Sequence, residues 1–171
     1  MKRLLGRSNI EISAMGIGCW AIGGPFQRTA DGKEFFPMGW GQVDDEESIR
    51  AIHAALDLGI TFIDTSNNYG AGHSEKVIGK ALQGRRDKVV IATKFGMVFD
   101  EEKKIHYDQD EDFIVTPEFI RESCEKSLER LQTDYIDLYQ FHWGAYDETK
   151  ALEVRSTLNQ LAMEGKIRAF G

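Results

Sequence analysis

The sequence predicts an α/β fold built around a parallel sheet. Three runs, "ITFID", "KVVIATK" and "YIDLYQFH", are mostly apolar and rich in β-branched and aromatic residues, as buried parallel strands are. Segments with apolar residues at helical spacing separate these runs. Strands that alternate with helices in this way pair in parallel through right-handed crossovers. We therefore expect about four βα units, in one domain over residues 1–171.

The composition is that of a globular chain and argues against several classes of protein. With 171 residues, of which 42% are hydrophobic and 29% charged, the chain can bury a sizeable core. The 28 acidic residues outnumber the 21 basic ones, and a net charge of −7 argues against general binding to nucleic acid or to an anionic membrane. No apolar run approaches the ~20 residues that span a bilayer, and the N-terminus does not have the pattern of a signal peptide. We expect a cytoplasmic protein.

The two cysteines indicate neither a disulfide framework nor a metal site. Cys19 and Cys124 lie far apart, and no spacing of Cys or His residues is typical of zinc ligands. We expect free thiols and no metal.

The first forty residues predict a hairpin, a third strand and a loop. Strand-like runs at residues 2–5 and 10–13 flank "GRSN", which favours a β-hairpin. The apolar "MGIGCW" is the next expected strand. A loop containing Gly, Phe and Pro is expected after it, through residue 41.

The first helix is predicted by its ends as well as by its apolar stripe. Asp44 is an N-cap candidate with Glu47 three residues later, and Gly59 is typical of a helix end. The apolar residues at helical spacing are Ile49, Ile52 and Leu56.

The next units repeat the alternation of strand and helix. "ITFID" is followed by a helix, "SEKVIGKAL", with Ser74 as its expected cap, and then by the strand "KVVIATK". A polar insertion from Gly96 to Val115 then interrupts the alternation.

The last units follow this insertion. Thr116 and Pro117 stand at the N-cap and first positions of a helix that precedes "YIDLYQFH". Its apolar stripe consists of Ile120, Cys124, Leu128 and Leu131. A further helix over residues 148–164 ends at Gly165, and "IRAFG" is typical of another strand.

Two arrangements of such a sheet are open at this point. An open, doubly wound sheet would place G-x-G-x-x-G directly after the first strand and at the start of a helix, whereas "GIGCWAIGG" leads into a long loop. A barrel of eight βα units would place functional residues at the carboxyl ends of its strands.

Ionisable residues do stand at the carboxyl ends of three consecutive strands. Asp64, Lys94 and His142 each end a strand, and Tyr69 lies in the loop just after Asp64. Because the carboxyl ends of parallel strands meet on one rim, these four residues should lie close together. An ionisable residue that caps an apolar row is expected to be paired or to take part in function.

The four residue types together predict proton delivery to a carbonyl oxygen. Tyrosine is a weak acid, with an unperturbed pKa of about 10, but a nearby ammonium favours its phenolate form. Lys94 could supply this ammonium, and Asp64 could hold it in place. His142 could donate a second hydrogen bond to the same oxygen. The hydride must come from elsewhere, and a nicotinamide cofactor is its usual source.

These segments resemble the aldo/keto reductases. "FIDTSNNYG", "IATKFG" and "YIDLYQFHW" are similar to the segments that carry the Asp, Tyr, Lys and His tetrad of that family. "GIGCWAIGG", "SEKVIGKAL" and "GKIRAFG" resemble other segments of the family, so the resemblance runs through the whole chain.

The resemblance implies a parallel (β/α)8 barrel of the TIM type with an N-terminal hairpin across its bottom. This chain would hold about the first four βα units. The implied activity is the reduction of aldehydes or ketones to alcohols by NADPH, with NADH as a possible replacement.

The resemblance also assigns a role to each member of the tetrad. Tyr69 would be the general acid and Lys94 the group that eases its ionisation. Asp64 would be the partner of Lys94, and His142 would orient the substrate. The residues implied to contact the cofactor are Gly18, Cys19, Trp20 and Asp64. The residues implied to line the substrate pocket are Trp20, Phe95 and Trp143.

One departure from the family is the length of the chain. Family members are about twice as long, and the half without a counterpart here would supply most of the cofactor site and cover the inner face of the sheet. Three situations stay open: a fragment of a longer protein, a half-barrel that dimerises, or a chain that depends on another partner. A non-catalytic role also stays open, because channel-associated subunits resemble the same family and act as cofactor-sensing interaction modules.

Overall fold

The structure, a computed structural model, describes residues 2–108, 114–142 and 148–171. Its centre is a five-stranded sheet with the order β11-β10-β7-β6-β3, and every neighbouring pair in it is parallel. The bounds of these strands are Gly16–Gly18 for β3, Phe62–Asp64 for β6, Val90–Phe95 for β7, Ile136–Phe141 for β10 and Ile167–Phe170 for β11. The predicted α/β class with a parallel sheet is confirmed.

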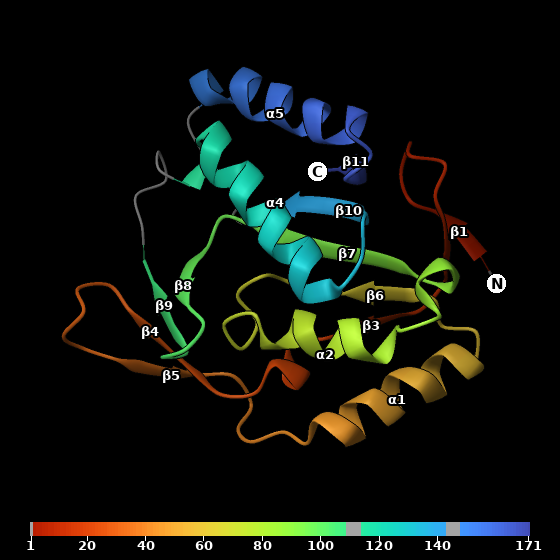
Figure 1. Cartoon of the computed structure of the whole chain (residues 1–171), viewed down its shortest axis with the longest axis horizontal. Coiled ribbons are helices and arrows are strands. Elements are labelled where there is room, and N and C mark those ends of the chain that lie inside the picture. Colours follow the sequence, from red (N-terminus) through yellow and green to blue (C-terminus); the bar gives the residue numbers. More distant parts are fainter. Residues whose placement is uncertain (1, 109–113, 143–147) are drawn as a thin grey trace.

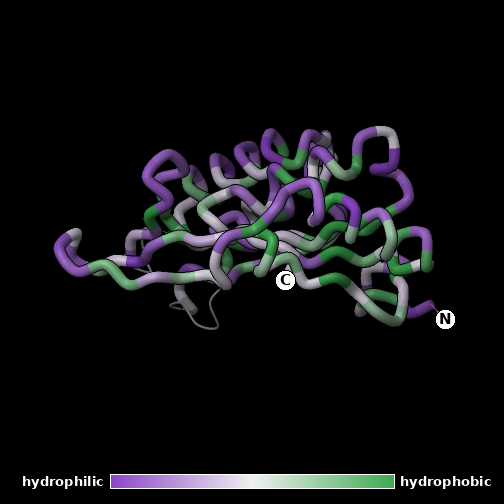
Figure 2. Tube along the Cα trace, turned by 90° about the horizontal axis from the view of Figure 1, so that it is seen from below, coloured by the Kyte–Doolittle hydropathy of each residue, from purple (hydrophilic) through white to green (hydrophobic). Residues whose placement is uncertain are grey.

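The helices that connect these strands lie along one face of the sheet (Figure 1). Figure 2 shows the same layering from another side, with hydrophilic residues on the outward turns of the helices. The helices are α1 (Asp45–Asp57), α2 (His73–Ala81), α4 (Pro117–Leu131) and α5 (Ala151–Met163), with short 3₁₀ turns η1 (Ala21–Gly23), η2 (Arg86–Lys88) and η3 (Glu148–Lys150).

The hydrophobic core fills the space between these helices and the sheet. Ile78 of α2, Ile91 of β7, Ile120 of α4 and Leu161 of α5 are completely buried in it. On the opposite face of the sheet, the inner face of a barrel, Leu138 is only half-buried. The sheet therefore has one covered face and one less covered face.

Two predicted helix starts are confirmed in detail. The Asp44 side chain accepts a hydrogen bond from the Glu47 N–H at 2.8 Å, and Thr116 accepts one from the Phe119 N–H at 3.3 Å. Pro117 occupies the first turn of α4, where its missing N–H costs nothing.

The expected cap of α2 was wrong. The helix begins at His73, and its N-cap is Gly72. Ser74 lies inside the first turn, where its hydroxyl is 2.9 Å from both the Cys19 carbonyl and the Thr65 hydroxyl. Its side chain therefore joins the loops after β3 and β6 instead of capping the helix.

The N-terminal hairpin is present as predicted. Strands β1 (Lys2–Leu4) and β2 (Glu11–Ser13) pair in antiparallel fashion. They lie at the amino ends of the parallel strands, on the right in Figure 1.

A second sheet was not predicted. The expected loop through residue 41 contains β4 (Phe26–Thr29) and β5 (Phe36–Met38), and the polar insertion contains β8 (Val98–Asp100) and β9 (Ile105–Tyr107). These strands form two hairpins joined by the parallel pair β4 and β9, in the order β5-β4-β9-β8. Figure 1 shows this small sheet on the left, at the carboxyl ends of the parallel strands.

No helix within the described ranges is long and apolar enough to cross a membrane.

Candidate active site

Lys94, near the end of β7, is held by three oxygens. Its ammonium donates to both carboxylate oxygens of Asp64 at 2.9 Å and to the Thr65 carbonyl at 2.7 Å. An ammonium has three N–H donors, and three acceptors match them. The Lys94 side chain is 15% exposed, so the positive charge is fixed in a largely dehydrated place.

Tyr69 lies beside this charge, in the loop after β6. Its ring centre is 5.2 Å from the Lys94 ammonium and 4.9 Å from the Trp20 ring. His142 meets the same ring edge-on, with 5.8 Å between centroids. The structure thus brings together the four residues that sequence reasoning placed on one rim.

The loop that carries Tyr69 is in backbone contact with the loop after β3. A Cβ atom at Gly70 would lie 1.8 Å from the Gly23 carbonyl oxygen, and Gly70 has a positive φ of 63°. Only glycine allows both this conformation and this approach.

His142 follows β10 and is neutral at neutral pH. Burial, followed by the positive charge of Lys94, lowers the pKa of His142 to about 4. Its Nδ1 atom lies 2.9 Å from the Ser66 hydroxyl. A neutral imidazole in this position can donate or accept a hydrogen bond, according to which nitrogen carries the proton.

A cavity of about 140 Å³ opens next to His142. It is lined by Trp20, Phe26, Arg28, Met38, Asn68, Met97, His106 and His142. Phe26, Arg28, Met38 and His106 come from the unpredicted small sheet. Sequence reasoning missed these residues, and the alternating run "IHY" around His106 was the available signal of a strand there.

Three residues that the resemblance implied for the cofactor or the substrate lie in different surroundings. Trp20 lines the cavity. Cys19 is completely buried in the core, and burial raises the pKa of its thiol to about 12. Gly18 is exposed, and a Cβ added to it would meet nothing within 4 Å. Space is therefore available beside Gly18, whereas the Cys19 side chain points into the core.

Phe95, an aromatic residue implied for the pocket, does not line the described cavity. Phe95 is completely buried and stacks on Tyr139, with 4.9 Å between ring centroids. It follows Lys94 in the same strand, so it points to the opposite face of the sheet. Trp143 lies outside the described residues.

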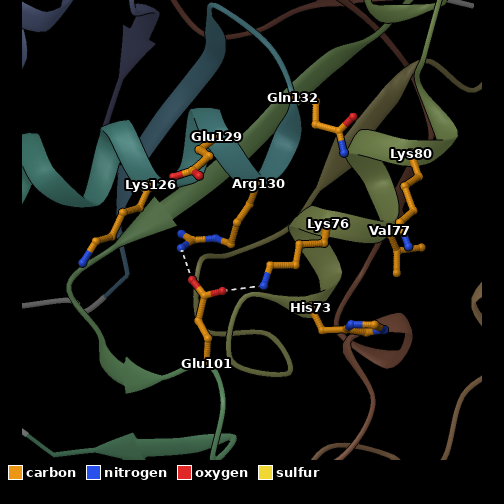
Figure 3. Close-up of a pocket in the computed structure, with 9 residues that line it drawn as sticks. All are labelled: His73, Lys76, Val77, Lys80, Glu101, Lys126, Glu129, Arg130 and Gln132. Carbon is orange, nitrogen blue, oxygen red and sulfur yellow. Dashed lines mark hydrogen bonds and ion pairs between the residues drawn. The ribbon is translucent and has the colours of Figure 1, made fainter.

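A second pocket, of about 430 Å³, lies between α2 and α4 on the helical side (Figure 3). Its most buried charge is that of Arg130, which pairs with Glu101 and Glu75 at 2.7 Å each. Lys76 binds the other oxygen of Glu101 at 2.5 Å. Because these cations already have carboxylate partners, we assign no ligand to this pocket.

Across residues 2–108, 114–142 and 148–171, no cluster of three or more His, Cys, Asp or Glu side chains is arranged to hold a metal ion.

Comparison with known proteins yields close relatives along almost the whole chain. The chain is 41% identical over 167 residues to the aldo-keto reductase YhdN of Bacillus subtilis, a match that covers 96% of this chain and 44% of that protein. It is 38% identical over 178 residues to the NADH-specific methylglyoxal reductase of Escherichia coli, covering all of this chain and 51% of that protein.

A solved structure agrees with these sequence matches. The aldo-keto reductase AKR11C1 from Bacillus halodurans, in its holo form, superposes with a TM-score of 0.79 and 34% identity. The match covers 99% of this chain and 49% of that one. The chain thus spans about half the length of the relatives that it matches. The pattern of the Aldo/keto reductase family matches residues 14–171, and the chain belongs to this family.

Proposed function

We propose that Tyr69 gives its proton to the carbonyl oxygen of a small aldehyde or ketone while a nicotinamide dinucleotide supplies the hydride. The product is the corresponding alcohol. The observation that carries this proposal is the Lys94 ammonium, which is held by Asp64 and Thr65 beside the Tyr69 ring.

The charges around Tyr69 support its role as the general acid. When Tyr69 loses its proton it becomes a phenolate, and the fixed ammonium of Lys94 stabilises that negative charge. Asp64 keeps the ammonium in place through two hydrogen bonds. His142, neutral at the same rim, orients the carbonyl oxygen by donating a hydrogen bond when its ring proton lies on Nε2 and not on the Nδ1 atom that faces Ser66.

The rim has room for the nicotinamide end of the cofactor. Gly18 is opposite Asp64 in the pairing of β3 with β6, and the space over it is open. Gly18, Trp20 and Asp64 would contact the cofactor, which supplies the hydride when bound. The buried Cys19 side chain has no place in this contact. We propose NADPH as the cofactor, with NADH as the alternative because the Escherichia coli relative is named NADH-specific.

The substrate that the cavity favours is small. Its volume is about 140 Å³, and its walls are mainly aromatic and thioether side chains with a few polar groups. Methylglyoxal is the first substrate to test, since the Escherichia coli relative is named for its reduction.

A further chain segment has to complete this site. Residues 1–171 would form one domain with the geometry of half a barrel, and we propose that its less covered sheet face packs against a second copy or another protein segment.

Both cysteines are free, buried thiols, which suits the cytoplasm, the location that we propose.

The test begins with titration of the chain by NADPH, followed through tryptophan fluorescence, with its mass in solution measured in parallel. Loss of NADPH absorbance with methylglyoxal is then compared between the wild type and Tyr69→Phe. We expect the variant to lose on the order of 10²- to 10⁴-fold in rate, the usual contribution of general acid catalysis.

Tyr139→Phe is the matched control for this experiment. It also removes one tyrosine hydroxyl, but that hydroxyl is buried in the core without a hydrogen-bond partner within the described part of the chain. It should keep the wild-type rate. Cofactor binding without any turnover would contradict the proposal and would support a cofactor-sensing role instead.

A further inference from the structure

Buried polar side chains connect the tetrad to the far wall of the cavity. The Ser66 hydroxyl lies 2.9 Å from His142 Nδ1 and 2.9 Å from Asn68 Oδ1. Asn68 Nδ2 lies 3.4 Å from His106 Nδ1. Ser66, Asn68 and His106 are 0%, 4% and 6% exposed. We call the side chains of His142, Ser66, Asn68 and His106 the relay.

The number of protons in the relay fixes the direction of its hydrogen bonds. A serine hydroxyl has one proton, and an amide oxygen can only accept, so Ser66 donates to Asn68 Oδ1. His142 Nδ1 must then donate to Ser66. In the neutral ring of His142 the proton therefore lies on Nδ1, and Nε2 has a lone pair instead.

The surroundings of His106, at the end of the relay away from His142, set the direction of these hydrogen bonds. Its Nε2 atom faces Asp108 Oδ1 at 3.6 Å, and Asp108 accepts a hydrogen bond from Arg28 Nε at 2.8 Å. A carboxylate favours a proton on the nitrogen that faces it. His106 Nδ1 is then an acceptor, and the Asn68 amide turns its NH₂ group toward it.

A change of protonation at His106 reverses the whole relay. A charged His106 has a proton on both nitrogens, so Asn68 must present its oxygen to His106 and its NH₂ group to Ser66. An asparagine amide can turn over with little change of shape. The nearest acceptor left for the Ser66 hydroxyl is then His142 Nδ1 at 2.9 Å, which is closer than Asn67 Oδ1 at 3.4 Å. Ser66 donates to His142 Nδ1, and the proton of His142 lies on Nε2.

We propose that His106 is a positioning residue that sets, through Asn68 and Ser66, which ring nitrogen of His142 carries the proton. The consequence for catalysis rests on the proposed function. Only when its proton lies on Nε2 does His142 have an N–H group that points away from Ser66 and can donate a hydrogen bond to a carbonyl oxygen.

Four charged side chains lie around the two histidines of the relay, and each comes from a different strand or from the segment just after it. Asp108 and Arg28 face His106, whereas Lys94 and Asp64 face His142. Burial lowers the pKa of His106, and the positive charge of Arg28 adds to this effect. The negative charge of Asp108 opposes it, but the pKa is still lowered overall. Both rings of the relay are then neutral at neutral pH. The Nε2–H form of His142 grows as the pH falls and His106 takes up a proton.

The test is a ¹⁵N NMR spectrum of the chain labelled in its histidines, at a pH slightly above neutral. Ring nitrogens with and without a proton resonate far apart, so the spectrum shows the position of the His142 proton directly. In the wild type we expect this proton on Nδ1. In His106→Gln the new amide can present either a donor or an acceptor to Asn68, so both proton positions of His142 become populated. The resonances of the two His142 nitrogens should then move toward each other.

His53→Gln is the matched control. It makes the same substitution at a histidine whose ring contacts the Ala81 carbonyl at 2.7 Å, outside the relay. The His142 resonances should not change in it. A second variant, Asn68→Asp, has nearly the same shape but can only accept, so it should keep the proton on Nδ1 even when combined with His106→Gln.

Equal His142 spectra in the wild type and in His106→Gln would overturn the proposal. If His106→Gln does not fold, a pH titration of the wild type decides: the His142 nitrogens should respond at the midpoint of His106, and a response only at the midpoint of His142 itself would also overturn it. Because neither measurement uses cofactor or substrate, a chain without reductase activity still tests the relay.

Discussion

The neutral state of His142 couples the stability of the fold to pH. Its pKa is lowered to about 4 by burial and by Lys94, against an ordinary value of 6.5. Between these two values the unfolded chain binds more protons at this residue than the folded chain does. The free energy of unfolding must therefore rise with pH through this window, and the contribution is complete above pH 6.5.

We predict that His142→Gln flattens this dependence. Between these two pKa values, the uptake of one proton on unfolding makes the free energy of unfolding change by at most about 1.4 kcal/mol per pH unit. The wild type should lose stability more steeply than the variant as the pH falls toward 4, the pKa of His142. Urea unfolding of both chains at several pH values measures the difference, and parallel curves would contradict the prediction. His106, whose pKa is also lowered, is present in both chains and contributes to both curves.

At the scale of elements, one carboxylate ties three strands together. Asp137 of β10 is completely buried and accepts hydrogen bonds from the Ile91 N–H of β7 at 2.9 Å and from Arg168 of β11 at 2.6 Å. Arg86 of η2 donates to it at 2.8 Å. A buried carboxylate with three donors is satisfied, and its removal leaves the Ile91 N–H without its acceptor and the Arg86 guanidinium without its carboxylate.

We predict that Asp137→Ala lowers the free energy of unfolding by about 3–5 kcal/mol, the usual cost of breaking a buried ion pair from one side. Arg168→Ala removes the other end of one of the same hydrogen bonds. The Arg168 side chain is 51% exposed, so we expect a loss of only about 0–1 kcal/mol there. Urea denaturation compares the two variants. Equal losses would show that Asp137 does not act as a shared acceptor.

The same strands show what sequence reasoning can and cannot place. The rule that functional residues follow the carboxyl ends of strands located Asp64, Lys94 and His142 correctly in space. Phe95 directly follows Lys94, and the alternation of side chains in a strand turns it to the helical face. That information was in the sequence. The burial of Cys19 also agrees with its residue type, since free cysteine is among the most buried residues.

At the scale of the whole molecule, contact between Gly23 and Gly70 joins the two sheets. Gly23 ends η1, which leads into the small sheet, and Gly70 belongs to the loop that carries Tyr69. A side chain at Gly70 would have to push the two loops apart.

We predict that Gly70→Ala lowers the free energy of unfolding by at least ~3 kcal/mol, because it combines strain at positive φ with a clash against the Gly23 carbonyl. Gly84→Ala is the matched control. Gly84 also has a positive φ, of 70°, but a Cβ atom there would meet nothing within 4 Å, so only the ~1–2 kcal/mol of backbone strain is expected. Similar losses in both variants would show that the two loops can separate at little cost.

The small sheet could not be predicted because its central pair is non-local. Strands β4 and β9 are only four and three residues long, so even the alternation in "IHY" is too short to predict a strand with any force. Each hairpin has a turn that could be predicted locally, since Asp31 and Asp100 accept hydrogen bonds from backbone N–H groups just after them. The parallel pairing between them depends on the whole fold.

The ion pair between Arg28 and Asp108 joins residues 80 positions apart in the chain. During synthesis the N-terminal hairpin and the strands β3, β6 and β7 leave the ribosome before Asp108 does. The strands of the parallel sheet can therefore begin to pair while the cavity still lacks one wall, so we expect the enclosure of the cavity to come late in folding.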